Sequence, residues 1–172
     1  MPLNGKFILN GDRYSSLTFP GVGSFEAFSG DGIYRNRGGC GYIPGQGSLP
    51  EGKYWIVSRS SGGLIAKGIA WAKDLYNQYH SGAVFRHSEW FALYRDDGMI
   101  DDFTFIKGVK RGNFRLHPGV LSDGCITLSK NTDFALLRNT LLRTPQMQVP
   151  GVKGLNSFGT IEVVNNGNNN FS

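Results

Sequence analysis

Residues 115–128, RLHPGVLSDGCITL, contain a histidine and a cysteine in two short segments separated by a turn-rich connection. Side chains alternate along a β-strand, so Leu116 should face away from His117, and Ile126 away from Cys125. Each segment is therefore predicted to be an amphipathic strand with an apolar side for the core and a polar side for a cleft. This pattern predicts a β-rich fold in which the two strands are neighbours.

The connection between these strands is short and sharply bent. Pro118 and Gly119 interrupt the first strand directly after His117, and residues 118–124 return the chain to Cys125. A return of this length can bring the imidazole and the thiol within hydrogen-bond reach. Since the proline offers no hydroxyl, we expect a backbone carbonyl to orient the imidazole. The alternative is two buried structural residues, which is the commoner situation for an arbitrary Cys–His pair.

The residue types around the cysteine suit acyl transfer. The thiolate is the nucleophilic form, and an adjacent imidazolium can lower the pKa of Cys125 below its usual value of about 8.5. His117 would then handle the proton of the leaving amine. Gly124 leaves room for the substrate, and the backbone N–H groups of Cys125, Gly124 or Asp123 could form an oxyanion hole. Ser122 would either bond within the turn or position the substrate.

The composition of the whole chain excludes several classes of protein. With 172 residues, of which 40% are hydrophobic and 18% charged, the chain is expected to form one globular domain. The net charge of +5 favours an anionic partner, but the basic residues are scattered and do not form a nucleic-acid-binding arm. There is no apolar stretch long enough for a membrane span or, at the N-terminus, for a signal peptide.

Short apolar runs between turn signals predict the other secondary-structure elements. Residues 65–79 and 132–142 have helical spacing, and Thr132 could cap the second helix. Residues 89–106 are predicted to form a hairpin around Asp97 and Gly98. The predicted strands lie at 6–9, 16–19, 24–28, 53–58, 89–95, 103–107, 113–117, 125–128 and 159–164.

The domain organisation follows from these elements. We predict one mainly β domain of the α+β type over residues 1–164, with about two helices. The glycine-rich stretch 30–52 is interpreted as a functional loop or flap, and residues 165–172, which are rich in asparagine, as a flexible tail.

The motif resembles a known family. S-D-G-C-I-T at 122–127 is similar to the S/T-x-G-C-I/V-R signature of L,D-transpeptidases with the YkuD-type catalytic domain. The short His–Cys spacing and the threonine after Gly-Cys-Ile are closer to the branch found in type VI secretion effectors that attack peptidoglycan. Looser similarity extends through LPEGKYWI at 49–56 and through residues 91–119. The resemblance implies a YkuD-like catalytic domain.

The same resemblance implies roles for individual residues. Cys125 would be the acylated nucleophile and His117 its base, while Ser122 and Gly124 would hold the turn. No metal or organic cofactor is implied.

Two positions depart from the wider family. Asp123 stands where a basic residue is common, and Thr127 replaces the usual arginine, so the substrate must be positioned differently. Arg115 and Thr127 are the candidate substrate contacts. For Arg115, which could bind a substrate carboxylate, a surface salt bridge is an equal alternative.

The remaining chemically notable residues are given non-catalytic roles. Cys40 is interpreted as an incidental thiol, since a bridge to Cys125 would consume the nucleophile. His80 and His87 match no metal spacing and are expected to be exposed. The carboxylates at 95–102 lack the closing glutamate of a calcium loop. Packing in the core or the flap is the favoured role for the tryptophans, Trp55, Trp71 and Trp90.

The resemblance thus implies a peptidoglycan-modifying enzyme, an L,D-carboxypeptidase or L,D-transpeptidase with D-amino acid exchange. Its substrate would be the tetrapeptide stem, and by analogy it would be a secreted effector active in the periplasm of a rival cell. The implied partners are the secretion apparatus and a cognate immunity protein. Two alternatives stay open: a papain-like peptidoglycan amidase or endopeptidase, and a non-catalytic peptidoglycan-binding module.

Overall fold

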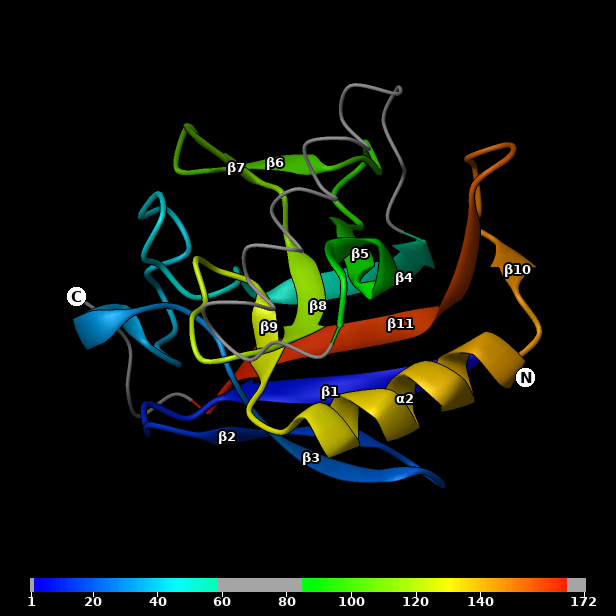
Figure 1. Cartoon of the computed structure of the whole chain (residues 1–172). Coiled ribbons are helices and arrows are strands. Elements are labelled where there is room, and N and C mark those ends of the chain that lie inside the picture. The colour runs from blue at the N-terminus through cyan, green and yellow to red at the C-terminus, as the bar shows by residue number, and fades with distance from the viewer. Residues whose placement is uncertain (1, 59–84, 167–172) are drawn as a thin grey trace.

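The computed structural model describes residues 2–58 and 85–166. In it, eight strands form a closed barrel in the order β1-β2-β3-β9-β8-β5-β4-β11, and β11 pairs back onto β1 (Figure 1). The barrel strands are β1 (Leu3–Leu9), β2 (Ser15–Phe19), β3 (Gly23–Phe28), β4 (Gly52–Ser58), β5 (Phe91–Arg95), β8 (Arg115–Pro118), β9 (Ile126–Leu128) and β11 (Asn156–Asn165).

Several smaller elements surround the barrel. The short strand β10 pairs with β11, and β6 and β7 form a separate two-stranded hairpin. One helix, α2, and two short 3-10 turns, η1 and η2, complete the described structure. These smaller elements are β6 (Phe103–Ile106), β7 (Val109–Gly112), β10 (Met147–Gln148), α2 (Asn131–Arg143), η1 (Gly32–Tyr34) and η2 (His87–Glu89).

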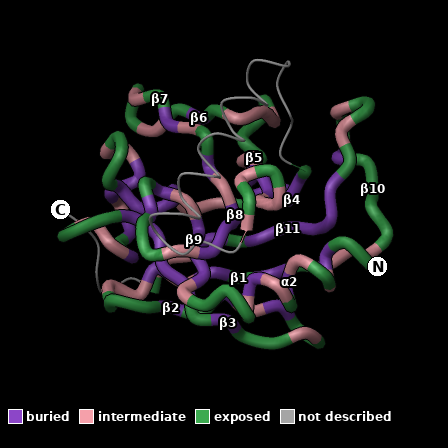
Figure 2. The backbone as a smooth tube through the Cα atoms, in the orientation of Figure 1, coloured by how far each residue is buried: buried purple, intermediate pink, exposed green. Residues whose placement is uncertain are grey.

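The mainly β prediction is confirmed. Every predicted strand is present, with ends shifted by no more than three residues, and within residues 2–58 and 85–166 only β7 and β10 were not predicted. Apolar alternation located the strands because one face of each packs into the barrel, where buried residues follow the strands (Figure 2).

The predicted hairpin at residues 89–106 is wrong. Both edges of β5 are occupied within the barrel, by β4 and by β8, so β5 has no edge left for β6. The tight turn lies instead between β6 and β7, where Lys107 and Gly108 have φ angles of 50° and 77°. Asp97 serves a local turn, since its carboxylate accepts hydrogen bonds from the Met99 N–H and the Thr104 hydroxyl.

The helix predicted at 132–142 is confirmed as α2, which packs against β8, β9 and β11. Its predicted cap is wrong, because the N-cap position is Lys130, which makes no side-chain capping bond, and Thr132 lies inside the helix. The other predicted helix, 65–79, lies outside the described residues. The apolar face of α2 is buried as expected, through Phe134, Leu137 and Leu141.

Closure of the barrel depends on one glycine in β11. At Gly159 the register of β11 against β4 shifts, and φ is 155°. A Cβ atom there would collide with the backbone of Leu3 on β1. Because β1 and β11 pair in parallel from Leu3 to Leu9, a side chain at Gly159 would force the closing strands apart.

The glycine-rich stretch between β3 and β4 is a packed scaffold, so its interpretation as a flap is wrong. Asn36, Cys40, Ser48 and Leu49 within it are at most 1% exposed. The Ser29 backbone N–H and the Leu49 N–H are bonded by side chains of the same segment. At the other end of the chain, β11 continues to Asn165, one residue beyond the predicted domain boundary, and residues 167–172 lie outside the described part.

Candidate active site

The parallel pairing of β8 and β9 positions the site. His117 lies opposite Thr127 and Leu116 opposite Ile126. Leu116 and Ile126 are fully buried in the core, so the polar residues share the other face, as alternation predicted. Cys125, directly before β9, is therefore two residues back from the partner of His117, diagonally across the strand pair.

The connection between β8 and β9 is unusually short for parallel strands, which normally need a dozen residues or more. Residues 119–125 suffice here because both strands are short and glycines with positive φ stand near both ends, Gly119 at 149° and Gly124 at 112°. The Gly119 N–H also donates to the Leu128 carbonyl, extending the pairing by one step. This return brings Cys125, directly before β9, next to the strand that carries His117.

His117 is held in a fixed orientation. The residue is 8% exposed, and its ring stacks on Trp90, with ring centroids 4.2 Å apart and planes 20° apart. Nδ1 lies 2.9 Å from the Pro118 carbonyl, which can only accept, so Nδ1 carries a proton. Nε2 lies 3.2 Å from the Thr127 hydroxyl. The expectation that a backbone carbonyl orients the imidazole is confirmed.

Thr127 is placed beside the imidazole. It is fully buried, and besides His117 its hydroxyl reaches the Leu121 carbonyl at 3.2 Å. A hydroxyl has one proton to donate. When Thr127 donates to Nε2, the imidazole is neutral, and when Thr127 donates to the Leu121 carbonyl, its oxygen can accept a hydrogen bond from the N–H of an imidazolium. These contacts make Thr127 a partner of the histidine, and its predicted substrate contact gains no support.

Cys125 is a free, partly buried thiol. Its Sγ accepts the Arg115 backbone N–H at 3.3 Å and lies 3.8 Å from the Asn113 carbonyl. Burial raises the pKa of Cys125 to about 11, against smaller opposing effects of the Arg115 N–H and of the Arg115 and Arg111 charges. The expected lowering of this pKa is wrong for this arrangement, since desolvation outweighs the nearby positive charges. At neutral pH the thiol of Cys125 is therefore uncharged.

The turn before Cys125 is held by hydrogen bonds of a buried serine side chain. The Ser122 hydroxyl donates to the Cys125 carbonyl at 2.7 Å and accepts the Gly30 N–H at 3.1 Å. Of its two predicted roles, bonding within the turn is the one observed. Gly124 has the expected unusual backbone, but the space of its missing side chain is filled by Arg111 rather than left open for a substrate. Asp123 is exposed, and its carbonyl faces the same arginine at 3.4 Å.

Arg111 is the functional candidate that the sequence did not reveal. Arg111 is buried, with only 5% of its surface exposed, yet its guanidinium has no carboxylate partner among the described residues. It donates instead to the backbone carbonyls of Gly41, Gly47 and Asp123. Burial lowers the pKa of Arg111. A buried cation therefore joins the scaffold loop to the turn that carries Cys125.

Arg115 makes the salt bridge that was its alternative role. Its guanidinium binds both oxygens of Asp102, with Nη1–Oδ1 at 2.7 Å and Nη2–Oδ2 at 2.9 Å. Although burial lowers the pKa of Arg115, the hydrogen bond and charge of Asp102 raise it above the ordinary value. This bidentate pair orders the strand start whose N–H contacts the thiol.

The other residues considered from sequence contribute packing. Cys40 is fully buried and free, with Sγ 3.0 Å from the Arg37 carbonyl, so the disfavoured bridge to Cys125 is absent. Trp55 is buried as predicted. His87 is only partly exposed and packs on Trp90, with ring centroids 4.1 Å apart. Outside the described residues lie Trp71 and His80.

Trp90 is a second residue whose place in the site was missed. Its role depends on the pairing of β5 with β8, and no local pattern in the sequence predicts that pairing.

Across residues 2–58 and 85–166, no three metal-binding side chains cluster, and no described helix is long and apolar enough to cross a membrane.

Comparison with known families identifies one relationship. The model of the Tlde1 domain matches residues 23–152, which include both His117 and Cys125. The match covers well over half of the chain, so the chain belongs to this family of type VI secretion effectors. No curated protein sequence matches the chain.

Proposed function

Taking membership of the Tlde1 domain family as the premise, we propose that this effector is a cysteine enzyme that modifies peptidoglycan stem peptides. Cys125 is the nucleophile and His117 the general base. The substrate is the tetrapeptide stem, and the reaction is L,D-carboxypeptidase cleavage or L,D-transpeptidase exchange. The observation that supports the proposal is the parallel β8–β9 pair: the free thiol of Cys125 stands two positions before Thr127, the pairing partner of His117, whose imidazole is oriented by a backbone carbonyl.

The first half-reaction forms a thioester. His117 Nε2 takes the thiol proton while Sγ attacks the carbonyl carbon of the L-centre of diaminopimelate. The resulting oxyanion collapses, the C–N bond to terminal D-alanine breaks, and His117 returns the proton to the leaving amine. Because burial raises the pKa of the Cys125 thiol, the proposed mechanism has the proton transferred to His117 as the sulfur attacks.

The second half-reaction regenerates the enzyme. Water attacks the thioester carbonyl in the carboxypeptidase reaction, and the amine of a D-amino acid or of another stem does so in exchange or cross-linking. His117 accepts the nucleophile's proton and delivers it to the departing sulfur. The backbone N–H groups of Cys125, Gly124 or Asp123 would donate to the oxyanion, and the positive charge of Arg111 supports the same turn.

The test is digestion of purified muropeptides with wild-type protein and with Cys125→Ala. The wild type should release D-alanine from tetrapeptide stems, and the variant should leave them intact. Trapping the reaction and finding a Cys125 peptide carrying the acyl stem by mass spectrometry would identify the thioester. Processing by Cys125→Ala would contradict the proposal.

One observation favours a second candidate. A buried, neutral thiol is also expected for a structural cysteine, such as one in a peptidoglycan-binding module. Such a module would bind muropeptides without changing them. If the products instead show cleavage between sugar and stem, the amidase alternative is correct.

The biological setting follows from the family. Type VI secretion effectors are exported and act in target cells, and the secretion apparatus and an immunity protein are the partners that this membership suggests. For this chain we propose action in the target periplasm, where the stem peptides are accessible. The immunity protein would then protect the producing cell by covering the face that carries His117 and Cys125.

A further inference from the structure

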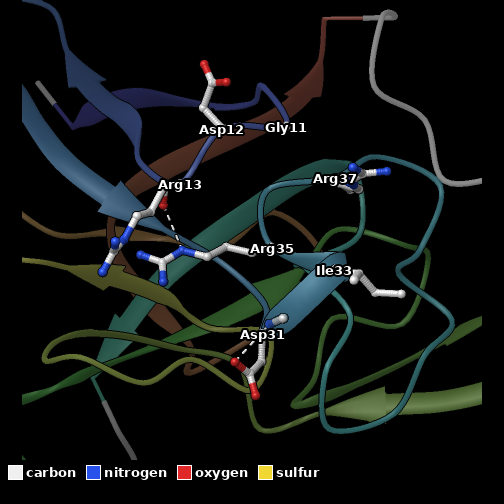
Figure 3. A pocket seen from close by; sticks show the side chains of 8 residues that line it. Gly11, Asp12, Arg13, Asp31, Ile33, Arg35 and Arg37 are labelled. Carbon is white, nitrogen blue, oxygen red and sulfur yellow. Dashed lines mark hydrogen bonds between the residues drawn. The ribbon is translucent and has the colours of Figure 1, made fainter.

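An open pocket of about 430 Å³ lies between the β1–β2 turn and the loop that contains η1 (Figure 3). Three arginines and two aspartates supply its charged lining. Among the described residues, neither aspartate forms an ion pair with these guanidinium groups. The pocket therefore offers positive charge that its own carboxylates do not neutralise. The charged residues are Asp12, Arg13, Asp31, Arg35 and Arg37.

Arg35 is rigidly held in this pocket. Its Nε donates to the Arg13 carbonyl at 2.7 Å, and its Cζ lies 3.8 Å from the centre of the Phe28 ring. Its Nη2 is buried without a hydrogen-bond partner. Although this buried nitrogen is closed to a ligand, the guanidinium as a whole makes no ion pair among the described residues, and a positive charge held in place without a counter-ion favours an anion.

A second guanidinium lies close to the first. The Cζ atoms of Arg13 and Arg35 are 5.7 and 4.9 Å from the centre of the Tyr14 ring, and Figure 3 shows the two groups beside each other. Two like charges held near one ring repel, and an anion between them relieves that repulsion. Planar guanidinium groups match the two oxygens of a carboxylate.

The pocket borders the turn of the candidate active site. Asp31 in its lining follows Gly30, whose N–H donates to the Ser122 hydroxyl, which in turn donates to the Cys125 carbonyl. An extended peptide spans about 3.3–3.6 Å per residue, so a stem of four residues held at Cys125 can extend well beyond this turn.

We propose that this pocket is a subsite for a carboxylate of the peptidoglycan stem peptide. The choice of ligand rests on the proposed function, and the site itself rests on the pocket and its arginines. Arg35 supplies the fixed donor, and Arg13 and Arg37 supply exposed charge at the rim. The subsite would select ionised stems over neutral peptides.

Binding tests the subsite without turnover. Calorimetric titration of Cys125→Ala with disaccharide-tetrapeptide should give a measurable affinity. Adding Arg13→Gln and Arg37→Gln, which change exposed side chains, should weaken binding by about tenfold or more. Arg143→Gln, an exposed arginine at the end of α2, is the matched control and should bind as the parent does. Arg35→Lys keeps the positive charge but loses the planar guanidinium, which can bind both oxygens of a carboxylate, so this change alone should weaken binding.

A second ligand identifies the interacting group. Tetrapeptide with amidated carboxylates should bind the parent weakly and be insensitive to the arginine changes. Equal binding of both peptides, or unchanged binding in the double variant, would overturn the subsite even if D-alanine is released. If the wild type releases no D-alanine but binding depends on both arginines and carboxylates, the subsite stands and the proposed reaction fails.

Discussion

Two glycine-rich connections meet at the candidate active site, and they differ in how they work. The β8–β9 connection is short, and its glycines let the chain reverse within 119–125. The loop between β3 and β4 is long, and its buried polar groups bond within the loop and to its neighbours. Glycine content alone suggested flexibility in the longer one, yet burial makes it a scaffold. The difference shows that glycine content alone does not predict how far a loop is buried and hydrogen-bonded.

Arg111 is what couples the two connections. It donates to the carbonyls of Gly41 and Gly47 in the scaffold loop and of Asp123 in the turn. Its positive charge also reaches Cys125, where it opposes the effect of burial on the pKa of the thiol. The proposed chemistry would therefore depend on the turn, which Arg111 joins to the scaffold loop. Four experiments separate these dependences.

The largest effect is expected from replacing His117, the proposed general base. His117→Gln should reduce D-alanine release by about 10²–10⁴-fold, because the general base is lost. The melting temperature should be measured in parallel, since the stack on Trp90 is also altered. Trp90→Phe, which keeps an aromatic ring against the imidazole, should retain most activity. Turnover of His117→Gln within about tenfold of wild type would exclude His117 as the base.

Removing the coupling between the connections should cost stability. Arg111→Met leaves three backbone carbonyls without their donor, and we expect the free energy of unfolding to fall by about 3 kcal/mol or more. Arg111→Lys should recover part of the loss. Arg143→Gln, on the exposed face of α2, should change stability by less than about 0.5 kcal/mol. Urea unfolding measures all three, and a stable Arg111→Met protein would show that the connections are independent.

Crowding the turn should have a smaller effect of the same kind. In Gly124→Ala the new methyl group meets Arg111 at a positive φ, so we expect a loss of about 2 kcal/mol and lower activity. Gly98→Ala is the matched control, because Gly98 also has a positive φ of 93° but open space around it. Its loss should be about 1 kcal/mol. Equal losses would mean that backbone strain, and not the arginine, limits this position.

The last prediction is a pH dependence at the thiol, which is confined to alkaline conditions. The pKa of Cys125 is raised from 9.0 to about 11, so the folded state favours the protonated thiol. Its contribution to stability is complete below pH 9 and is lost as the pH rises towards 11. Urea midpoints of wild type and Cys125→Ala should therefore draw together across this range. A constant difference would show that burial does not raise the pKa.

The same pair of regions shows how far sequence reasoning reached. Alternation in 114–117 and 125–128 correctly predicted which side chains face the core, because burial of one strand face is a local pattern. The helix from Asn131 to Arg143 followed from its spacing in the same way. The hairpin at Asp97–Gly98 failed because β5 uses both of its edges inside the barrel.

For the candidate site too, the sequence predicted the residues of the local motif and missed those that come from distant segments. The motif picked out Cys125 and His117 from residue types and spacing, and Pro118 pointed to a backbone carbonyl as the partner of the imidazole. Arg111 and Trp90 were missed because each reaches the site from a segment distant in sequence. The salt bridge of Arg115 was foreseen only as one of two roles, since Asp102 becomes its partner through folding.

By itself the sequence determined the β-rich class, the faces of the strands and the residues that could carry acyl transfer. These properties follow from side-chain periodicity and from the intrinsic chemistry of thiol and imidazole. Only the tertiary structure decided the barrel closure, the parallel β8–β9 register, the buried arginine and the raised pKa of the thiol. Each of these depends on which distant segments exclude water from one another, and desolvation cannot be assigned until the neighbours are known.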